Sequence, residues 1–355
     1  MNETERGIVA ADTLADLWLK GPAQQVLLYS GLPASGKTKS ALEWTAEDPD
    51  RRVRINYDDL RLELFGANWK FNFKGESLMQ DTARSRAIAA LKASKSIVVD
   101  NTNLTPRSRN KWKSLAEANN ALYVEQEFDT PVALCKTRDA ERTGKARVGW
   151  AVIDWMALSN GYIDWEDRVN YPRDFLIVDM DGTLTDCEWR RKFLEPKLTH
   201  KLDCTAVDSD GLFKNYSFID NSTGRCKQCG IKPRKNWGAF FRGVGEDPPV
   251  KAVLQLVKYL YHHYDILIVS GRPIDQCGMA TELWLREHLL SQGIIPRHLF
   301  MRKSQDQRPD TEVKQEILDL LPKNRISYVL DDRDVVVKMW RDNGLTCLQV
   351  ANGAF

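Results

Sequence analysis

The segment Gly31–Thr38 reads GLPASGKT and carries residue types that suit the binding of nucleotide phosphates. It stands between an apolar run over 25–30 and a helical pattern that begins near Lys37. Glycines let backbone N–H groups converge on phosphate oxygens, and the N-terminus of a helix adds positive potential. The Lys37 ammonium would neutralise the β and γ phosphates, and the Thr38 hydroxyl would hold Mg²⁺. We assign the binding of a nucleoside triphosphate to Gly31, Ser35, Gly36, Lys37 and Thr38.

A carboxylate and several arginines suit the transfer of a phosphoryl group from that nucleotide. Asp58 follows the apolar run 53–55, and parallel strands end at one crevice, so Asp58 is a candidate general base for an attacking hydroxyl. Arg61, one turn further on, would hold a phosphate of the acceptor. The plainer interpretation is an Asp that caps a helix beside a solvated Arg.

A basic segment later in the first half carries Arg138 and Arg142, which are four residues apart. This spacing places both side chains on one helix face. Arginines that close over ATP stabilise the charge on the transferring group. A solvated charged helix is the alternative.

A pair of aspartates after the apolar run 175–178 suits a second kind of phosphoryl transfer. Asp179 can attack phosphorus and form an aspartyl-phosphate. Asp181 can protonate the leaving oxygen and then activate water. Mg²⁺ is needed, because a carboxylate does not approach a phosphate dianion without charge neutralisation.

Three further features follow these aspartates in order. Ser270 ends an apolar run and offers a hydroxyl to the phosphate, and Lys314 supplies a cation. Asp331 and Asp332 end a third run and supply metal ligands. Each feature is weak alone, but their order at the ends of elements favours one site. The expected Mg²⁺ ligands of this site are Asp179, Asp181, Asp331 and Asp332.

Short apolar runs alternate with helical patterns in both halves of the chain, which indicates parallel α/β sheets. In the first half we expect strands at 25–30, 53–55, 96–99 and 121–124, and helices at 78–95 and 107–118. In the second half we expect strands at 175–178, 265–269 and 326–330, and helices at about 250–263, 275–292 and 311–321. The predicted fold class is α/β, with two domains that are each a parallel sheet flanked by helices.

A polar stretch broken by Gly and Pro predicts a linker over 161–173. It would join a first domain over 24–160, preceded by an extension over 1–23, to a second domain over 174–355. Residues 186–248 form a connection too long for a plain turn, so we expect an insertion or cap there.

The composition excludes several classes of protein. The 355 residues suit two domains, and 51 Lys+Arg against 49 Asp+Glu give a net charge of +2, which excludes a histone-like protein. No window approaches the roughly 20 apolar residues of a membrane span. The polar N-terminus predicts no secretory signal, and the seven cysteines then favour reduced thiols in the cytoplasm.

The second half resembles the haloacid-dehalogenase-type phosphatases through DMDGTLT at Asp179–Thr185, SGR at Ser270–Arg272, Lys314 and the pair Asp331-Asp332. A P-loop kinase followed by this phosphatase is similar to the bifunctional polynucleotide 5′-kinase/3′-phosphatases of the T-even bacteriophage type. The resemblance covers about 24–355 except the insertion. It implies a P-loop NTPase fold and then a haloacid-dehalogenase-like Rossmannoid fold with a cap.

The same resemblance implies a role for each site residue. Asp58 would be the general base on a 5′-hydroxyl end, Arg61 would contact the neighbouring phosphate, and Arg142 would be the lid arginine. Asp179 would be the nucleophile and Asp181 the acid/base, and Asp310 would orient Lys314. The phosphate and metal would be held by Ser270, Arg272, Lys314, Asp331 and Asp332.

The insertion departs from the family pattern, because it holds four of the seven cysteines. Cys226 and Cys229 form a C-x-x-C knuckle, and His200 and Cys204 are four residues apart, so a tetrahedral zinc site is one interpretation. Free thiols on a loop are the other. The aromatic residues of the insertion are expected to pack the cap rather than stack on bases: Trp237, Phe240 and Phe241.

These features predict a cytoplasmic enzyme that phosphorylates 5′-hydroxyl ends of DNA or RNA with ATP. It would also remove 3′-phosphates, or open 2′,3′-cyclic ends, ahead of a ligase; homo-oligomerisation stays open. One alternative is a small-molecule kinase fused to a metabolite phosphatase, and another is a nucleic-acid end sensor without catalysis. The intact Lys37, Asp58, Asp179 and Asp181 argue against the sensor.

Overall fold

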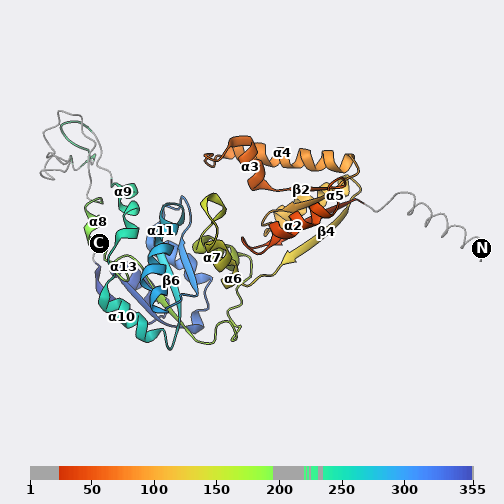
Figure 1. The fold of residues 1–355 in the computed structure, drawn as a ribbon. Coiled ribbons are helices and arrows are strands. Elements are labelled where there is room, and N and C mark those ends of the chain that lie inside the picture. The colour runs from red at the N-terminus through yellow and green to blue at the C-terminus, as the bar shows by residue number, and fades with distance from the viewer. Residues whose placement is uncertain (1–23, 195–219, 221, 224, 231–234, 354–355) are drawn as a thin grey trace, which may run out of the picture. The chain divides into compact units, whose positions relative to one another are not determined.

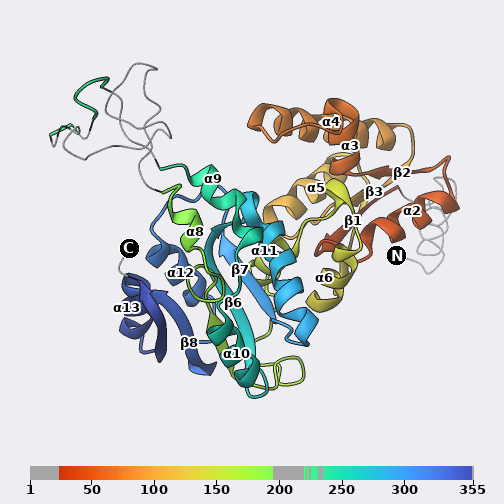
Figure 2. The same ribbon diagram turned by 60° about the vertical axis from the view of Figure 1, so that its left-hand side comes forward.

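The computed structural model describes residues 24–194, 220, 222–223, 225–230 and 235–353. The chain divides into two compact units, over 1–142 and 143–355. Each unit contains one parallel sheet with helices packed on it (Figures 1 and 2). The prediction of two α/β domains is confirmed. Within the described residues no helix is both long and apolar enough for a membrane crossing.

The first unit contains a four-stranded parallel sheet in the order β2-β3-β1-β4. Its strands are β1 (Gln25–Gly31), β2 (Arg52–Ile55), β3 (Ser96–Asp100) and β4 (Leu122–Phe128). Its helices are α2 (Lys37–Glu47), α3 (Tyr57–Phe65), α4 (Phe73–Lys92), α5 (Pro106–Ala118) and α6 (Val132–Ala140). All four expected strands are confirmed.

Alternation along β1 gives this sheet two apolar faces. Val26 and Leu28 pack with residues of α3, α4 and α5. Leu27 and Tyr29 pack on the other face, with Ala41 of α2. Because both faces are buried, a slip of one residue would exchange the two sets, so the register of β1 is fixed. The loop after β1 therefore starts at a defined point at the C-terminal end of a central strand.

The second unit contains a five-stranded parallel sheet in the order β7-β6-β5-β8-β9. Its strands are β5 (Phe175–Val178), β6 (Asp265–Pro273), β7 (His298–Arg302), β8 (Ile326–Arg333) and β9 (Cys347–Gly353). Its α-helices are α7 (Trp150–Ser159), α8 (Glu188–Arg191), α9 (Trp237–Arg242), α10 (Lys251–Leu260), α11 (Ile274–His288), α12 (Asp310–Asp319) and α13 (Asp334–Asp342). The three expected strands are confirmed, and β7 and β9 are additional.

Helix α7 packs against β7 of the second unit. The indole N–H of Trp155 donates to the carbonyl of Met301 at 2.7 Å, and the carboxylate of Asp154 lies 2.7 Å from Nδ1 of His298. The helix shares the core of the second sheet, to which Trp150 and Ala151 contribute. The division between the units consequently falls before α7, earlier than the expected linker over 161–173.

The expected extension over 1–23 and much of the insertion lie outside the described residues. In the described part of the insertion, Phe240 is buried and its ring packs edge-on against Phe241, as expected. Trp237 stacks on Phe241 with its ring centroid 5.6 Å away, while about half of its own surface stays exposed. These aromatic side chains thus pack mainly against one another.

Candidate functional site

The lysine of the phosphate-binding loop is held inside the loop. Nζ of Lys37 lies 2.9 Å from the carbonyl oxygen of Gly31, 2.6 Å from that of Leu32 and 3.1 Å from Oγ of Ser35. Burial lowers the pKa of Lys37 to about 8. Thr38 is exposed in the first turn of α2. An anionic ligand placed at this helix N-terminus would compete for the ammonium with the loop's own oxygens.

Glycine is required at the start of this loop. Gly31 has a φ of +144°, and a Cβ there would lie 2.8 Å from the carbonyl oxygen of Phe128. Gly36, with a φ of +109°, precedes α2 in the left-handed region. The two glycines allow the chain to turn from β1 into α2 within a few residues.

Asp58 and Arg61 lie together on α3. Nη1 of Arg61 is 2.6 Å from Oδ1 of Asp58, and the guanidinium also bonds the carboxylate of Glu76 on α4 at 2.8 and 3.1 Å. The side chain of Asp58 is 87% exposed, so its carboxylate is open to a ligand. The helix is capped by Asn56, whose side chain accepts hydrogen bonds from two amides of the first turn. Asn56, and not Asp58, is therefore the residue that caps this helix.

A buried polar cluster attaches the start of α3 to the end of β3. Asp100, 2% exposed, accepts hydrogen bonds from the guanidinium of Arg54 at 2.7 and 3.0 Å, and its carbonyl accepts one from Asn56. The side-chain oxygen of Asn101 accepts a hydrogen bond from the amide of Tyr57 at 2.9 Å. These contacts set the direction in which α3 leaves the sheet. The polar segment DNTN, which begins at Asp100 at the end of β3, is a sequence signal that could have predicted this cluster.

Arg138 and Arg142 do not lie on one helix face, contrary to the prediction. Helix α6 ends at Ala140, so Arg138 lies in its last turn and Arg142 lies beyond it. The guanidinium of Arg142 is 3.9 Å from the carboxylate of Asp139. Its positive charge contributes to the lowered pKa of Lys37. The helix stops early, but Arg142 still lies close enough to Lys37 to act on it.

Three carboxylates converge in the second unit. The oxygens of Asp179, Asp331 and Asp332 lie within 4.8 Å of one another, and all three residues are buried. Nζ of Lys314 is 2.8 Å from Asp179 and 2.7 Å from Asp331. Burial raises the pKa of Asp179 well above its usual range, and burial together with Asp331 raises the pKa of Asp332 to about 6. These four residues, which the sequence analysis assigned to one site, lie together in the structure.

The charge of this cluster fits a divalent cation. One ammonium faces three carboxylates, so ionisation of all three leaves uncompensated negative charge in a buried place. Oxygen ligands of this kind suit a hard cation such as Mg²⁺. Gly182 allows the close approach: its φ is +81°, and a Cβ there would overlap the carboxylate of Asp332.

The Asp181 carboxylate lies outside the three-carboxylate group, contrary to the expected set of four metal ligands. Its Oδ1 is 2.5 Å from Arg272 and 2.7 Å from Arg190, both fully buried. Burial opposes ionisation, but these two guanidinium groups lower the pKa of Asp181 to about 2. Asp247 accepts hydrogen bonds from both arginines and completes a balanced group of charges. The sequence analysis missed Arg190 and Asp247.

Two other expected contacts differ in the structure. Arg272, expected at the phosphate, has its guanidinium committed to Asp181, Asp247 and threonine hydroxyls, because it is buried at the end of β6. Asp310, expected to orient Lys314, instead bonds Arg302 and Arg333. Lys314 pairs directly with Asp179 and Asp331, and the negative charge of Asp310 also acts on it. Ser270 is buried at the expected place, and its Oγ accepts a hydrogen bond from the Arg272 amide.

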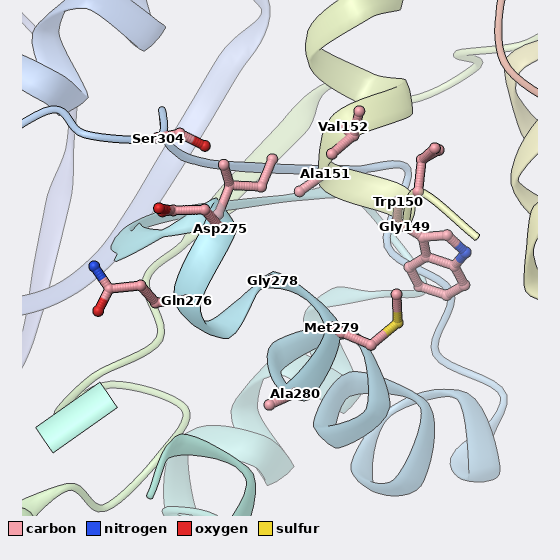
Figure 3. A pocket seen from close by; sticks show the side chains of 12 residues that line it. Gly149, Trp150, Ala151, Val152, Asp275, Gln276, Gly278, Met279, Ala280 and Ser304 are labelled. Carbon is pink, nitrogen blue, oxygen red and sulfur yellow. The ribbon is translucent and has the colours of Figure 1, made fainter. Parts of the chain in front are cut away.

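A cavity of about 320 Å³ lies between the N-terminal turns of α7 and α11 (Figure 3). Its lining is mostly apolar, with Trp150 and Met279 on one side and Asp275, Gln276 and Ser304 as polar groups. None of the predicted site residues lines it. The cavity and the carboxylate cluster are therefore separate features of the second unit.

The C-x-x-C knuckle forms a tight turn. The amide of Gly230 donates to the carbonyl of Cys226 at 2.8 Å, and Arg225 donates to the carbonyl of Gly230 at 3.0 Å. Cys226 is buried and Cys229 is half-buried. The other two expected zinc ligands, His200 and Cys204, lie outside the described residues, so the zinc site stays a prediction.

Fold and site together define the class of protein: a P-loop domain followed by a phosphatase domain of the haloacid-dehalogenase kind. Comparison with known families agrees with this class. Residues 26–159 match the AAA domain family, and residues 231–355 match the family described as the polynucleotide kinase PNKP phosphatase domain. The first of these regions is therefore similar to AAA domains, and the second is similar to the phosphatase domains of polynucleotide kinases.

Individual relatives extend over both units. A putative bifunctional polynucleotide kinase/RNA ligase of Autographa californica nuclear polyhedrosis virus is 26% identical over an alignment of 343 residues, and the match covers 90% of this chain and 41% of that protein. This chain thus spans about two fifths of the length of that curated relative.

Solved structures give weaker likenesses. A chain of the Pnkp1/Rnl/Hen1 RNA repair complex is 21% identical, with 94% of this chain and 97% of that chain covered and a TM-score of 0.33. The APS kinase CysC of Mycobacterium tuberculosis is 19% identical, with 34% and 70% covered and a TM-score of 0.29. Both TM-scores lie below 0.5, so neither likeness supports a statement about function.

Proposed function

We propose that this chain heals broken nucleic-acid ends, by phosphorylating 5′-hydroxyl ends with ATP and removing phosphate from 3′ ends. One observation carries the proposal. The chain contains both a P-loop, whose carbonyl oxygens bind the Lys37 ammonium, and a buried carboxylate cluster with Lys314. Its C-terminal region matches the phosphatase domain of polynucleotide kinases.

In the kinase reaction, the P-loop would bind the triphosphate through Gly31, Ser35, Gly36, Lys37 and Thr38. Asp58 would take the proton from the attacking 5′-hydroxyl, a role that its exposed carboxylate suits. Arg61 would turn part of its guanidinium from Asp58 to the acceptor's nearest phosphate. Arg138 and Arg142 would stabilise the charge on the transferring group.

In the phosphatase reaction, Asp179 would attack phosphorus while the bond to the 3′ oxygen breaks. The leaving oxygen would take a proton from Asp181, and Asp181 would then accept a proton from the water that hydrolyses the acyl-phosphate. Lys314 and Ser270 would bind the phosphate oxygens. Asp179, Asp331 and Asp332 would hold Mg²⁺, which supplies neutralising charge when bound.

The acid role of Asp181 sets a condition on substrate binding. In the structure two arginines keep its carboxylate ionised, with a pKa of about 2. A group in this state accepts a proton but does not donate one at neutral pH. We therefore infer that the entering phosphate draws Arg272 toward itself, which weakens the pairing and allows Asp181 to take up a proton.

We further propose that a ligase consumes the healed ends, since the curated viral relative is described as a kinase joined to an RNA ligase.

The zinc site is a separate proposal. Metal analysis of the purified protein tests it: one zinc per chain is expected, and a content well below this would remove zinc from the account.

The test of function is an end-specific assay on the purified chain with ATP and Mg²⁺. DNA and RNA strands with a 5′-hydroxyl and a 3′-phosphate should gain the first phosphate and lose the second. Free sugars, nucleosides and small phosphate esters serve as competing substrates. Faster turnover of these small molecules than of strands would favour the fusion of a metabolite kinase with a metabolite phosphatase.

A further inference from the structure

Four aromatic side chains form a continuous row between α3 and α4, which we call the aromatic ladder: Phe65, Trp69, Phe71 and Phe73. Phe65 ends α3, Phe73 begins α4, and the other two lie in the connecting loop, drawn in orange in Figure 1. Phe65 stacks on Trp69 with ring centroids 5.2 Å apart. Edge-on contacts at 6.2 and 5.5 Å continue the row to Phe71 and Phe73.

The ladder is held by the ends of both helices. Gly66 ends α3 with a φ of +75°, and its amide donates to the carbonyl of Leu62. The side chain of Asn72 caps α4 by accepting a hydrogen bond from the Gly75 amide at 2.8 Å. A Cβ at Gly75 would lie 3.1 Å from Nε1 of Trp69, so glycine makes room for the indole. The rings are therefore positioned by local structure.

The outer rings are presented to solvent. Phe71 is 58% exposed and Phe73 is 84% exposed. Lys70 and Lys74 flank these two rings in the sequence and are exposed, and neither forms an ion pair among the residues that the structure describes. A row of exposed rings between unpaired cations is the pattern of a surface that stacks bases and attracts a phosphate backbone.

We propose that the aromatic ladder is a stacking platform for a single strand whose 5′-hydroxyl end lies at Asp58. This inference rests on the proposed kinase function. Asp58 and Phe65 are seven residues apart on the same helix, which corresponds to about 10 Å at about 1.5 Å per residue. Bases stacked at about 3.4 Å would cover this distance in about three nucleotides.

The platform therefore contacts bases beyond the terminal nucleotide. A nucleoside 3′-monophosphate offers the 5′-hydroxyl and its nearest phosphate but does not extend to the ladder. Stacking depends little on base identity, because every base has a π-face. The platform thus favours strands over small acceptors without reading their sequence.

The experiment compares kcat/KM for two acceptors, a ten-nucleotide 5′-hydroxyl strand and a nucleoside 3′-monophosphate. In the double variant Phe71→Ala/Phe73→Ala, the ratio of the two values should fall about tenfold. The double variant Phe71→Tyr/Phe73→Tyr keeps the rings and should keep the ratio. Leu122→Ala, which removes an apolar side chain of similar exposure on β4, is the control for general surface effects.

An unchanged ratio in the alanine variant would overturn the platform. A shift in sedimentation toward smaller species, with the ratio unchanged, would assign the ladder to a protein interface instead. If the unaltered protein phosphorylates neither acceptor, the kinase proposal fails. In that case fluorescence anisotropy of a labelled 5′-hydroxyl strand decides separately whether the rings bind it.

Discussion

Lys37 links the local environment of one side chain to nucleotide binding. Its ammonium is buried, and this burial lowers the pKa of Lys37 to about 8. The protonated form is the one that attracts phosphates, so kcat/KM for ATP should be level below pH 8 and fall about tenfold per pH unit above it. The kcat profile should stay level to higher pH, because bound phosphates favour the ammonium.

A matched variant separates this effect from other titrations. Arginine stays protonated throughout the range, so any activity left in Lys37→Arg should lack the decline above pH 8. A wild-type profile of kcat/KM that stays level through pH 9.5 would contradict the assignment.

Arg190 positions Asp181 and neutralises Asp247. Replacing it with Met leaves the Asp247 carboxylate with Arg272 and the indole N–H of Trp189, and losing one partner of a buried ion pair costs about 3–5 kcal/mol. We expect a lower midpoint of denaturant unfolding for the second unit and loss of 3′-phosphatase activity. Because Asp181 would lose one of its two guanidinium partners, its pKa should rise, and the alkaline limb of kcat/KM for any residual phosphatase activity should move to higher pH.

Arg190→Lys provides the control, because it keeps one positive charge at the same place. It should recover part of the stability and part of the activity. Wild-type stability and an unmoved pH profile in Arg190→Met would show that the arginine does not position Asp181.

At the scale of elements, the turn after β5 depends on one glycine. Gly182 combines a positive φ with contact against Asp332, so Gly182→Ala should move Asp332 away from the cluster. We expect phosphatase activity to fall about a hundredfold or more, with the kinase unchanged, in the end-specific assay.

Gly293→Ala is the matched control. Its φ of +77° is nearly the same, but a Cβ there meets nothing within 4 Å. It should cost about 1 kcal/mol of stability and leave both activities in place. Equal loss of phosphatase in both variants would show that backbone strain, and not displacement of Asp332, is the cause.

The elements that sequence analysis missed have mixed patterns. Strand β7 begins with His298 and ends with Arg302, although all five of its residues are buried. His298 bonds to the buried Asp154, and Arg302 donates to the carbonyl of Gly271. Strand β9 is mostly exposed at the edge of the sheet and carries polar residues. The central strands β1, β5 and β8 were predictable, since burial on both faces requires an apolar run.

The sites divide in the same way. Groups at strand ends, such as Asp179 and Asp331, could be predicted because topology brings the ends of parallel strands together. Arg190 could not be predicted, because its partner Asp247 lies 57 residues away across the insertion. The direct ion pairs of Asp310 with Arg302 and Arg333 could not be predicted, since a sequence does not tell which of several cations a carboxylate will meet.

At the scale of the whole molecule, each unit carries its own reactive groups. The P-loop, Asp58 and Arg142 lie within residues 1–142, and the carboxylate cluster lies within residues 143–355. No residue is assigned to both reactions. The central claim is therefore that one chain holds two chemically independent sites for phosphoryl transfer.

The most direct measurement follows both ends of one strand, with a 5′-hydroxyl and a 3′-phosphate, in Lys37→Ala and Asp179→Asn. Lys37→Ala should lose the kinase by about a hundredfold or more and keep the phosphatase. Asp179→Asn should show the reverse. Loss of both activities in either variant, with unfolding curves like those of the unaltered protein, would contradict the claim of two independent sites.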